Sequence, residues 1–168
     1  MVVVCNGDSW TQGDSPSQSF NWNVEKSEMI DNYMVFPNFA DPYMKFDDSV
    51  LNKFYCSPVW PKVLATTLGV KTYNVGRLGR SNTDILLTTI NAVNTLLKSG
   101  ETELVVIVGW SSLLRKSIFC YDGKDDKVKP IQIRPLTEGF EHMYDNITPL
   151  EDDFALCIYT LQEFLKSK

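Results

Sequence analysis

Histidine is nearly absent from this chain: its 168 residues include one histidine, His142, and four cysteines without Cys-x-x-Cys spacing. Zinc sites usually combine several such ligands, so we expect no metal centre. The sequence also lacks a Gly-x-Gly-x-x-Gly run and a Walker A sequence. Because these glycine-rich turns hold phosphate groups, their absence argues against a nucleotide, and we expect no cofactor.

Long basic runs and long apolar runs are missing too. Acids and bases are mixed along the chain, with a formal net charge of -5, so nucleic acid is not an expected partner. No apolar run approaches the roughly 20 residues that span a bilayer. We therefore expect neither a nucleic-acid-binding protein nor a membrane protein.

The start of the chain and its cysteines bear on where the protein works. Met1 is followed by the apolar residues 2–5, without the basic leader or the small-residue cleavage site of a signal peptide. Cys5 and Cys157 lie in apolar stretches, where a free thiol packs as a small hydrophobe. These features predict reduced thiols and a cytoplasmic protein.

Three short apolar runs rich in β-branched residues predict buried parallel strands at residues 2–5, 70–75 and 104–108. Helical patterns lie between them. Ser57-Pro58 places a capping residue and a proline at one helix start, and Ser81 precedes Asp84 as in a capping box. The second helix carries one apolar stripe, formed by Leu86, Ile90, Val93 and Leu97. Alternating strands and helices predict an α/β doubly wound parallel sheet in one domain, residues 1–168, with sites beyond the carboxyl ends of strands.

Two further elements follow the third strand. Residues 118–135 have the pattern of a hairpin around Asp122-Gly123. Residues 148–151 open a last helix, whose apolar face consists of Leu150, Phe154, Cys157, Leu161 and Phe164. No strand is predicted after this helix.

Residues 13–56 form an insert without a clear period, and nine aromatic residues lie in it. A structureless connection of this length is uncommon unless it is functional, so the insert is a candidate lid or binding wall. The alternative is that its rings pack the insert onto the domain as ordinary core material.

The first predicted strand runs into the sequence Asn6-Gly7-Asp8-Ser9-Trp10-Thr11-Gln12-Gly13. A serine on the tight turn after a parallel strand holds its hydroxyl at the carboxyl edge of the sheet, where its own N–H can face a developing oxyanion. The Gly-Asp-Ser-x-Thr-x-Gly pattern resembles the first block of the SGNH/GDSL hydrolases, a family of esterases, lipases and carbohydrate deacetylases. The resemblance implies a flavodoxin-like three-layer fold, Ser9 as nucleophile and a small ester or acylated carbohydrate as substrate. We expect Asp8 to support the turn and Trp10 to contact the substrate.

The segments after the other two strands extend the resemblance. Residues 74–82 are similar to the family's second block, in which a glycine lends its N–H to the oxyanion. Gly79 matches that glycine, and we expect Asn82 nearby to contact the substrate. Residues 108–112 align with the third block, Gly-x-Asn, whose asparagine amide is another oxyanion donor. Ser111 stands in place of that asparagine, so its hydroxyl is the expected donor, with shorter reach, and Trp110 is an expected substrate contact.

The family's fourth block, Asp-x-x-His, has no match in this sequence. The setting of His142 differs, since Gly139 stands three residues before it. We expect His142 to be a surface or structural residue; the alternative is a rebuilt dyad with Glu138 or Glu141. A serine without an adjacent base is a weak nucleophile, so the hydrolase is expected to be incomplete or inactive alone.

In the family, a helix like that at residues 148–166 is followed by another strand beside the third strand and then by the histidine segment. The sheet is therefore expected to be truncated, with residues 104–108 left as an unpaired edge. Three hypotheses follow. A second polypeptide supplies the strand and Asp-x-x-His, or the chain is a binding module that has lost catalysis, or the hairpin at residues 118–135 covers the edge.

The asparagine- and lysine-rich composition and the sequence Trp110-Ser111-Ser112 resemble SGNH proteins of bacteriophages. This resemblance makes a virion the other expected location. It also supports an alternative function as a non-catalytic binding or structural module of a phage particle, with the aromatic insert as its contact surface. Flavin bound to a flavodoxin-like sheet is a further alternative.

Overall fold

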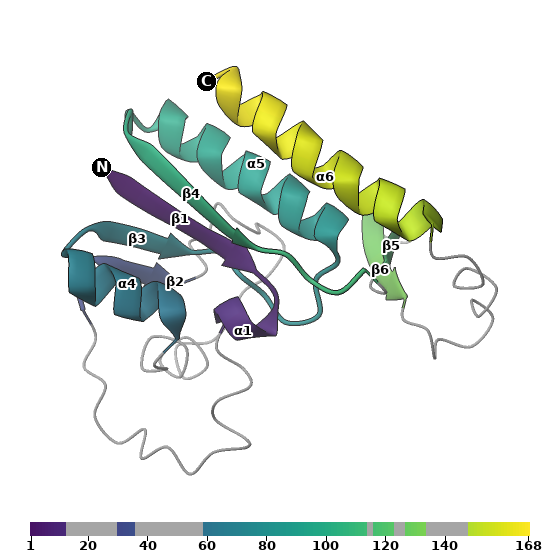
Figure 1. Cartoon of the computed structure of the whole chain (residues 1–168), viewed down its shortest axis with the longest axis horizontal. Coiled ribbons are helices and arrows are strands. Elements are labelled where there is room, and N and C mark those ends of the chain that lie inside the picture. The colour runs from purple at the N-terminus through teal and green to yellow at the C-terminus, as the bar shows by residue number, and fades with distance from the viewer. Residues whose placement is uncertain (13–29, 36–58, 114–115, 123–126, 134–147) are drawn as a thin grey trace, which may run out of the picture.

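The computed structural model describes residues 1–12, 30–35, 59–113, 116–122, 127–133 and 148–168, and for residues 9–10 and 116–150 within these ranges it describes the backbone. Four strands form one parallel sheet in the order β2-β3-β1-β4 (Figure 1). They are β1 (Val2–Gly7), β2 (Tyr33–Val35), β3 (Lys71–Asn74) and β4 (Leu104–Gly109). The predicted α/β parallel sheet, with residues 2–5 between 70–75 and 104–108, is confirmed.

β1 is the central strand that its uninterrupted apolar sequence predicts. All six of its residues are buried. Val2 lies opposite Lys71 on β3 and opposite Leu104 on β4. A strand flanked on both sides and covered on both faces favours apolar side chains, as at residues 2–5, because every position is removed from water. The buried polar residue at its end, Asn6, has hydrogen-bond partners instead.

β4 is less buried than its apolar run predicts, whereas its single pairing is the one expected of an edge strand. Among the described residues it pairs with β1 alone, so its other edge carries no strand. Exposure alternates along it, with Val105 41% and Ile107 36% exposed. Within the described part of the chain, β4 therefore presents apolar side chains and a backbone edge that pairs with no other strand.

β2 lies inside the insert at residues 13–56, where the sequence predicted no regular structure. Tyr33 and Val35 are buried in a cluster with Val59 and Ala65. For Tyr33, the alternative that the rings of the insert pack onto the domain is confirmed. The other parts of the insert, residues 13–29 and 36–56, lie outside the described residues, and so does the proposed lid.

Two helices cover opposite faces of the sheet. α4 (Trp60–Leu68) packs Ala65 against Tyr33 of β2, whereas α5 (Asn82–Lys98) packs Ala92 and Leu96 against the other face, which presents Tyr73. Side chains alternate between faces along a strand, so β3 contributes to both layers.

The helix starts test two capping predictions. Ser81 accepts a hydrogen bond from the Asp84 N–H at 3.2 Å, and Asp84 accepts one from the Ser81 N–H, so the predicted capping box of α5 is confirmed. The predicted start of α4 at Ser57-Pro58 is wrong. Val59 is its N-cap and Pro61 lies in its first turn, while residues 57–58 lie outside the described residues.

The last helix, α6 (Thr148–Lys166), packs on α5 through Cys157 and Leu161, which contact Leu86. The predicted hairpin is also confirmed: β5 (Lys116–Asp122) and β6 (Lys127–Ile133) pair antiparallel. They form a sheet of their own, so the hairpin adds no strand to the edge of β4.

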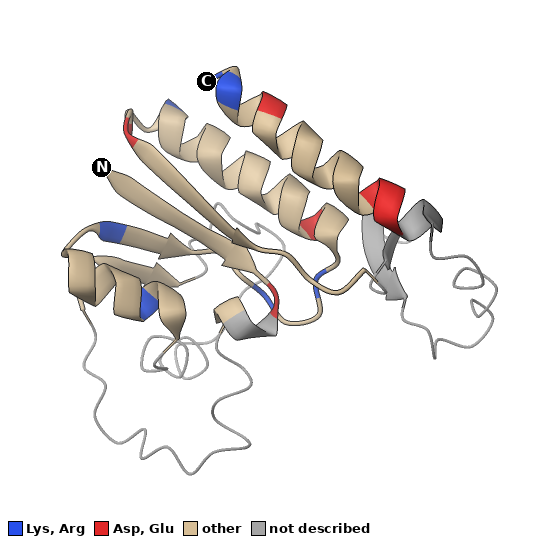
Figure 2. Cartoon of the chain, viewed as in Figure 1, with Lys and Arg blue, Asp and Glu red and all other residues tan. Residues whose placement is uncertain are grey.

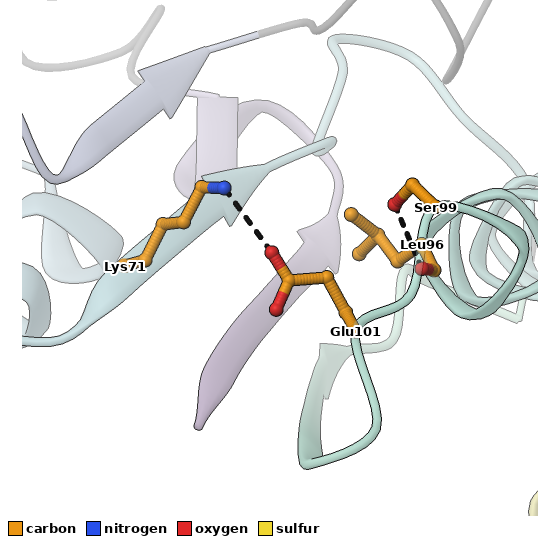
Figure 3. Close-up of polar contacts among 4 residues, drawn as sticks. All are labelled: Lys71, Leu96, Ser99 and Glu101. Atoms are coloured by element: carbon orange, nitrogen blue, oxygen red, sulfur yellow. Dashed lines mark hydrogen bonds and ion pairs between the residues drawn. The ribbon is translucent and has the colours of Figure 1, made fainter.

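Ion pairs join the elements at the amino ends of the strands. The Lys71 ammonium lies 3.2 Å from the Glu101 carboxylate (Figure 3), and the amino group of Met1 lies 3.2 Å from Glu103. Hydrogen bonding to Tyr73 and then to Glu101 raises the pKa of Lys71. Such exposed pairs contribute little, about 0–1 kcal/mol each, so they help to fix the register more than the stability.

Charged residues of both signs are spread over several elements in Figure 2, with no basic run along the strands and helices that are drawn in colour. At the end of α5 the Ser99 hydroxyl donates to the Leu96 carbonyl at 2.8 Å, which closes the helix before β4 begins (Figure 3). Of the helices in the described ranges, none carries an apolar stretch long enough to cross a bilayer.

Candidate functional site

The chain turns into a short helix, α1 (Ser9–Gln12), directly after β1. The carbonyl of Asp8 accepts hydrogen bonds from the N–H groups of Thr11 at 3.1 Å and Gln12 at 3.0 Å, so Asp8 supports the turn through its backbone. Ser9 is the first residue of this helix, where N–H groups have no partner within the helix. The Ser9 hydroxyl and the Trp10 side chain, both predicted site groups, lie outside the described part of the chain.

Three glycines surround the side chain of Thr11. A Cβ on Gly76 would lie 2.6 Å from Thr11 Cγ2, and a Cβ on Gly7 would lie 2.7 Å from the Gly109 carbonyl oxygen. The Trp60 indole N–H reaches the Thr11 hydroxyl at 3.4 Å. Because these glycines lack side chains, α1 fits closely against the ends of three neighbouring strands.

Asn74, at the end of β3, joins this helix to the sheet. Its amide nitrogen donates to the Thr11 carbonyl at 2.7 Å and to the Tyr33 hydroxyl at 2.9 Å. Its amide oxygen accepts from the Gly76 N–H at 3.0 Å. Asn74 is fully buried, so each of these bonds replaces one that water would make.

Two further bonds bring the predicted oxyanion loop to the Ser9 turn. The Arg77 N–H donates to the Gly7 carbonyl at 2.9 Å, and the Leu78 N–H donates to the side-chain oxygen of Gln12. Gly79 follows with a φ of +78°, a conformation that favours glycine. Gln12 occupies a variable position of the first block, so no motif in the sequence indicated its role.

The loop after β4 contacts both the Ser9 turn and the start of α5. The Ser111 hydroxyl donates to the Asp8 carboxylate at 3.5 Å, and the Ser111 N–H donates to the side-chain oxygen of Asn82 at 2.7 Å. Asn82 is 6% exposed and Ser111 is 8% exposed. These predicted site residues are thus linked in one group, with the half-buried Asp8 at one end and the buried Asn82 at the other.

Trp110, an expected substrate contact, has packing partners on α6. Its ring meets Phe154 edge to face, with centroids 5.8 Å apart. It belongs to the cluster of Leu86, Cys157 and Leu161. Its described contacts therefore attach α6 to the end of β4.

Asn6 forms the buried base of the site. Apart from its place before Gly7, nothing in the sequence indicated this role. Its amide nitrogen lies 2.9 Å from the Ile85 carbonyl and 2.8 Å from the Thr89 hydroxyl on α5. Its amide oxygen accepts from the Gly7 N–H at 2.8 Å. Arg80, also buried and also missed, donates to Thr88 on the same helix.

The two described thiols do not provide a competing nucleophile. Both Cys5 and Cys157 are free and buried. Burial raises the pKa of Cys5 to about 12, and burial is also the main reason why the pKa of Cys157 is raised. Thiols with such pKa values stay protonated near neutral pH, and a thiol is a poor nucleophile in that form.

Two further predictions concern metal ligands and the histidine. Within the described ranges, no three His, Cys, Asp or Glu side chains gather as metal ligands would. His142, with Glu138 and Glu141, lies outside those ranges.

A shallow hollow of about 230 Å³ lies between α5, β4 and the end of α6. Its lining includes Val93, Leu97, Leu104, Val106 and Leu165. It contains none of the predicted site residues and borders the unpaired edge of β4.

Comparison with known proteins gives one result. The model of the Family of unknown function (DUF6071) matches residues 42–159, which is more than two thirds of the chain. The match includes Gly79, Asn82 and Ser111 but begins after Ser9. No curated protein and no solved structure matches significantly. The chain therefore belongs to the Family of unknown function (DUF6071).

Proposed function

We propose that this protein is a serine ester hydrolase of the SGNH/GDSL type, with a flavodoxin-like three-layer fold and Ser9 as its nucleophile. The substrate class is a small ester or an acylated carbohydrate. One observation carries the proposal: the Ser9 turn leaves the central strand and is hydrogen-bonded to the loops after both neighbouring strands. Sites in parallel α/β sheets gather at such carboxyl ends.

The chemistry follows from this arrangement. The Ser9 hydroxyl oxygen attacks the ester carbonyl carbon, and the carbonyl oxygen gains negative charge. Backbone N–H groups aimed at that oxygen stabilise it, since they need no reorganisation during the reaction. Ser9 and Gly79 supply these donors in the proposal. Gln12 and Arg77 support it, because their hydrogen bonds hold the Gly79 loop against the Ser9 turn.

The proton of Ser9 needs a base, and we propose that a second polypeptide brings a histidine, on an Asp-x-x-His segment, against Ser9. The edge of β4 favours strand addition, because residues 104–109 include no charged residue and no proline to discourage pairing. The exposed side chains of Val105 and Ile107 would gain apolar neighbours from the added strand on the same face of the sheet. A dyad of His142 with Glu138 or Glu141 is the competing source of the base.

A fluorophosphonate probe tests the proposal directly. The purified chain is incubated with the probe and with imidazole as an exogenous base, and the modified residue is identified by mass spectrometry. We expect labelling at Ser9, lost in Ser9→Ala and retained in Ser99→Ala, a matched change at an exposed serine. Labelling that is absent in the wild type, or equal in Ser9→Ala, would leave a non-catalytic binding module as the better explanation.

A further inference from the structure

Only one end of the Asn82 carboxamide has a hydrogen-bond partner among the described residues. Its oxygen accepts the Ser111 N–H at 2.7 Å, so this end of the group must be the oxygen and the other end must be the NH₂. Among the described residues, this NH₂ group has no hydrogen-bond partner. Asn82 is nevertheless 6% exposed. A buried donor left unsatisfied costs about 1–3 kcal/mol, so the arrangement favours an acceptor that arrives with a ligand.

The hydroxyl and the N–H of Ser111 are less available as oxyanion donors than its position in the third block suggests. Its N–H is engaged by Asn82, and its hydroxyl is directed at the carboxylate of Asp8. A hydroxyl has a single proton, so one that donates to Asp8 has none left for an oxyanion. Ser111 instead connects the residue before Ser9 with Asn82.

We infer that Asn82 Nδ2 is the third oxyanion donor of this site, in place of the asparagine that the SGNH/GDSL third block would carry at position 111. The donor comes from the first turn of α5, and the N–H of Ser111 orients it by holding its oxygen. The ligand is the tetrahedral oxyanion formed from a carboxylic ester, or a phosphonyl group that resembles it. This inference rests on the proposed function.

The first test measures the rate at which a fluorophosphonate modifies Ser9 in the presence of imidazole. In this reaction the bond from Ser9 Oγ to phosphorus forms, the phosphorus–fluorine bond breaks, fluoride leaves, and the hydroxyl proton passes to imidazole. The phosphoryl oxygen gains negative charge as the ester carbonyl does. Loss of one oxyanion donor should therefore slow modification by about 10²–10³-fold.

Two substitutions separate donation from structure. Asn82→Asp keeps an oxygen that can accept the Ser111 N–H but removes the NH₂, and Asn82→Ala removes both. We expect both variants to be slowed to a similar extent. Asn94 lies on the same helix, and its side chain makes no hydrogen bond among the described residues, so Asn94→Asp and Asn94→Ala should react at the wild-type rate.

Each other outcome overturns the inference in a recognisable way. A wild-type rate in Asn82→Asp with a slow Asn82→Ala would mean that Asn82 only holds Ser111. A slow Asn82→Asp with a wild-type Asn82→Ala would mean that the added charge, not the lost donor, acts. A slow Ser111→Ala with both Asn82 variants unchanged would assign the donor to the Ser111 hydroxyl. If the wild type is not modified at Ser9, the proposed function itself fails.

A second measurement does not depend on rates. The side-chain amide protons of Asn82 should shift downfield in the NMR spectrum when Ser9 is phosphonylated, whereas those of Asn94 should stay in place. Unchanged Asn82 signals in the modified protein would overturn the inference. Thermal unfolding midpoints of the Asn82 variants verify that they are folded.

Discussion

Asn74 and Thr11 are joined by a hydrogen bond of 2.7 Å, in which a side-chain amide at the end of β3 donates to the backbone of the helix that carries Ser9. Asn74→Ala should leave the Thr11 carbonyl and the Gly76 N–H without partners. We expect the free energy of unfolding to fall by about 3 kcal/mol. Urea denaturation measures this, and Asn94→Ala should change it by less than about 0.5 kcal/mol. Equal effects of the two changes would contradict the prediction.

Gly76→Ala tests the close fit around Thr11. The new Cβ would lie 2.6 Å from Thr11 Cγ2, so the variant should lose about 1–3 kcal/mol of stability through overpacking. Thr11→Gly removes the atoms that clash. The double variant should therefore lose less stability than the two single variants added together, as a double-mutant cycle of urea denaturation would show. Strict additivity would mean that the two residues do not press on each other.

Stability should fall in alkaline solution because of Cys5. Burial raises the pKa of its thiol to about 12, from an ordinary value of 9.0. Between these two pH values, the folded chain keeps a proton that the unfolded chain has released. The free energy of unfolding then decreases as pH rises through this window, by about 1.4 kcal/mol per pH unit for one proton. Denaturation curves of the wild type and Cys5→Ala across the window should show a smaller slope in the variant. Parallel slopes would count against the raised pKa.

The purified chain alone should show little or no turnover of a short-chain aryl ester. A serine without its base keeps only about 10³–10⁴-fold acceleration over water from binding and the oxyanion donors. Imidazole should increase turnover in the wild type but not in Ser9→Ala, and His142→Ala should behave as the wild type. Robust Ser9-dependent turnover that disappears in His142→Ala would identify His142 as the base.

The sequence predicted the parts of the fold whose signal is local. Continuous apolar stretches marked β1 and β4, the β-branched and aromatic residues of 70–75 marked β3, and the Ser81 capping box marked the start of α5. β2 was missed because three residues carry no period, and its stability comes from pairing with β3 and from packing on Val59. Strand formation there is decided by tertiary contacts, which outweigh local preference.

The candidate site shows the same division. The predicted strand ends indicated that Ser9, Gly79 and Ser111 each follow the carboxyl end of a strand. Their connections depend on side chains at positions that no motif specifies, such as Gln12 and Asn82. Which atom of an amide accepts a bond follows only from three-dimensional geometry, so the acceptance of the Ser111 N–H by Asn82, on which its proposed donor role rests, could not have been predicted from the sequence.

The register of β1 has a consequence for how the chain acquires its fold. Val2 lies opposite both Lys71 and Leu104, so the central strand pairs only with segments that are synthesised much later. Until residues 104–109 have emerged from the ribosome, the apolar segment that forms β1 lacks one of its two pairing strands, β4. Contacts between distant segments slow folding, because a long loop must close before they form. The parallel sheet should therefore form only after β4 has been synthesised, late in the production of the chain.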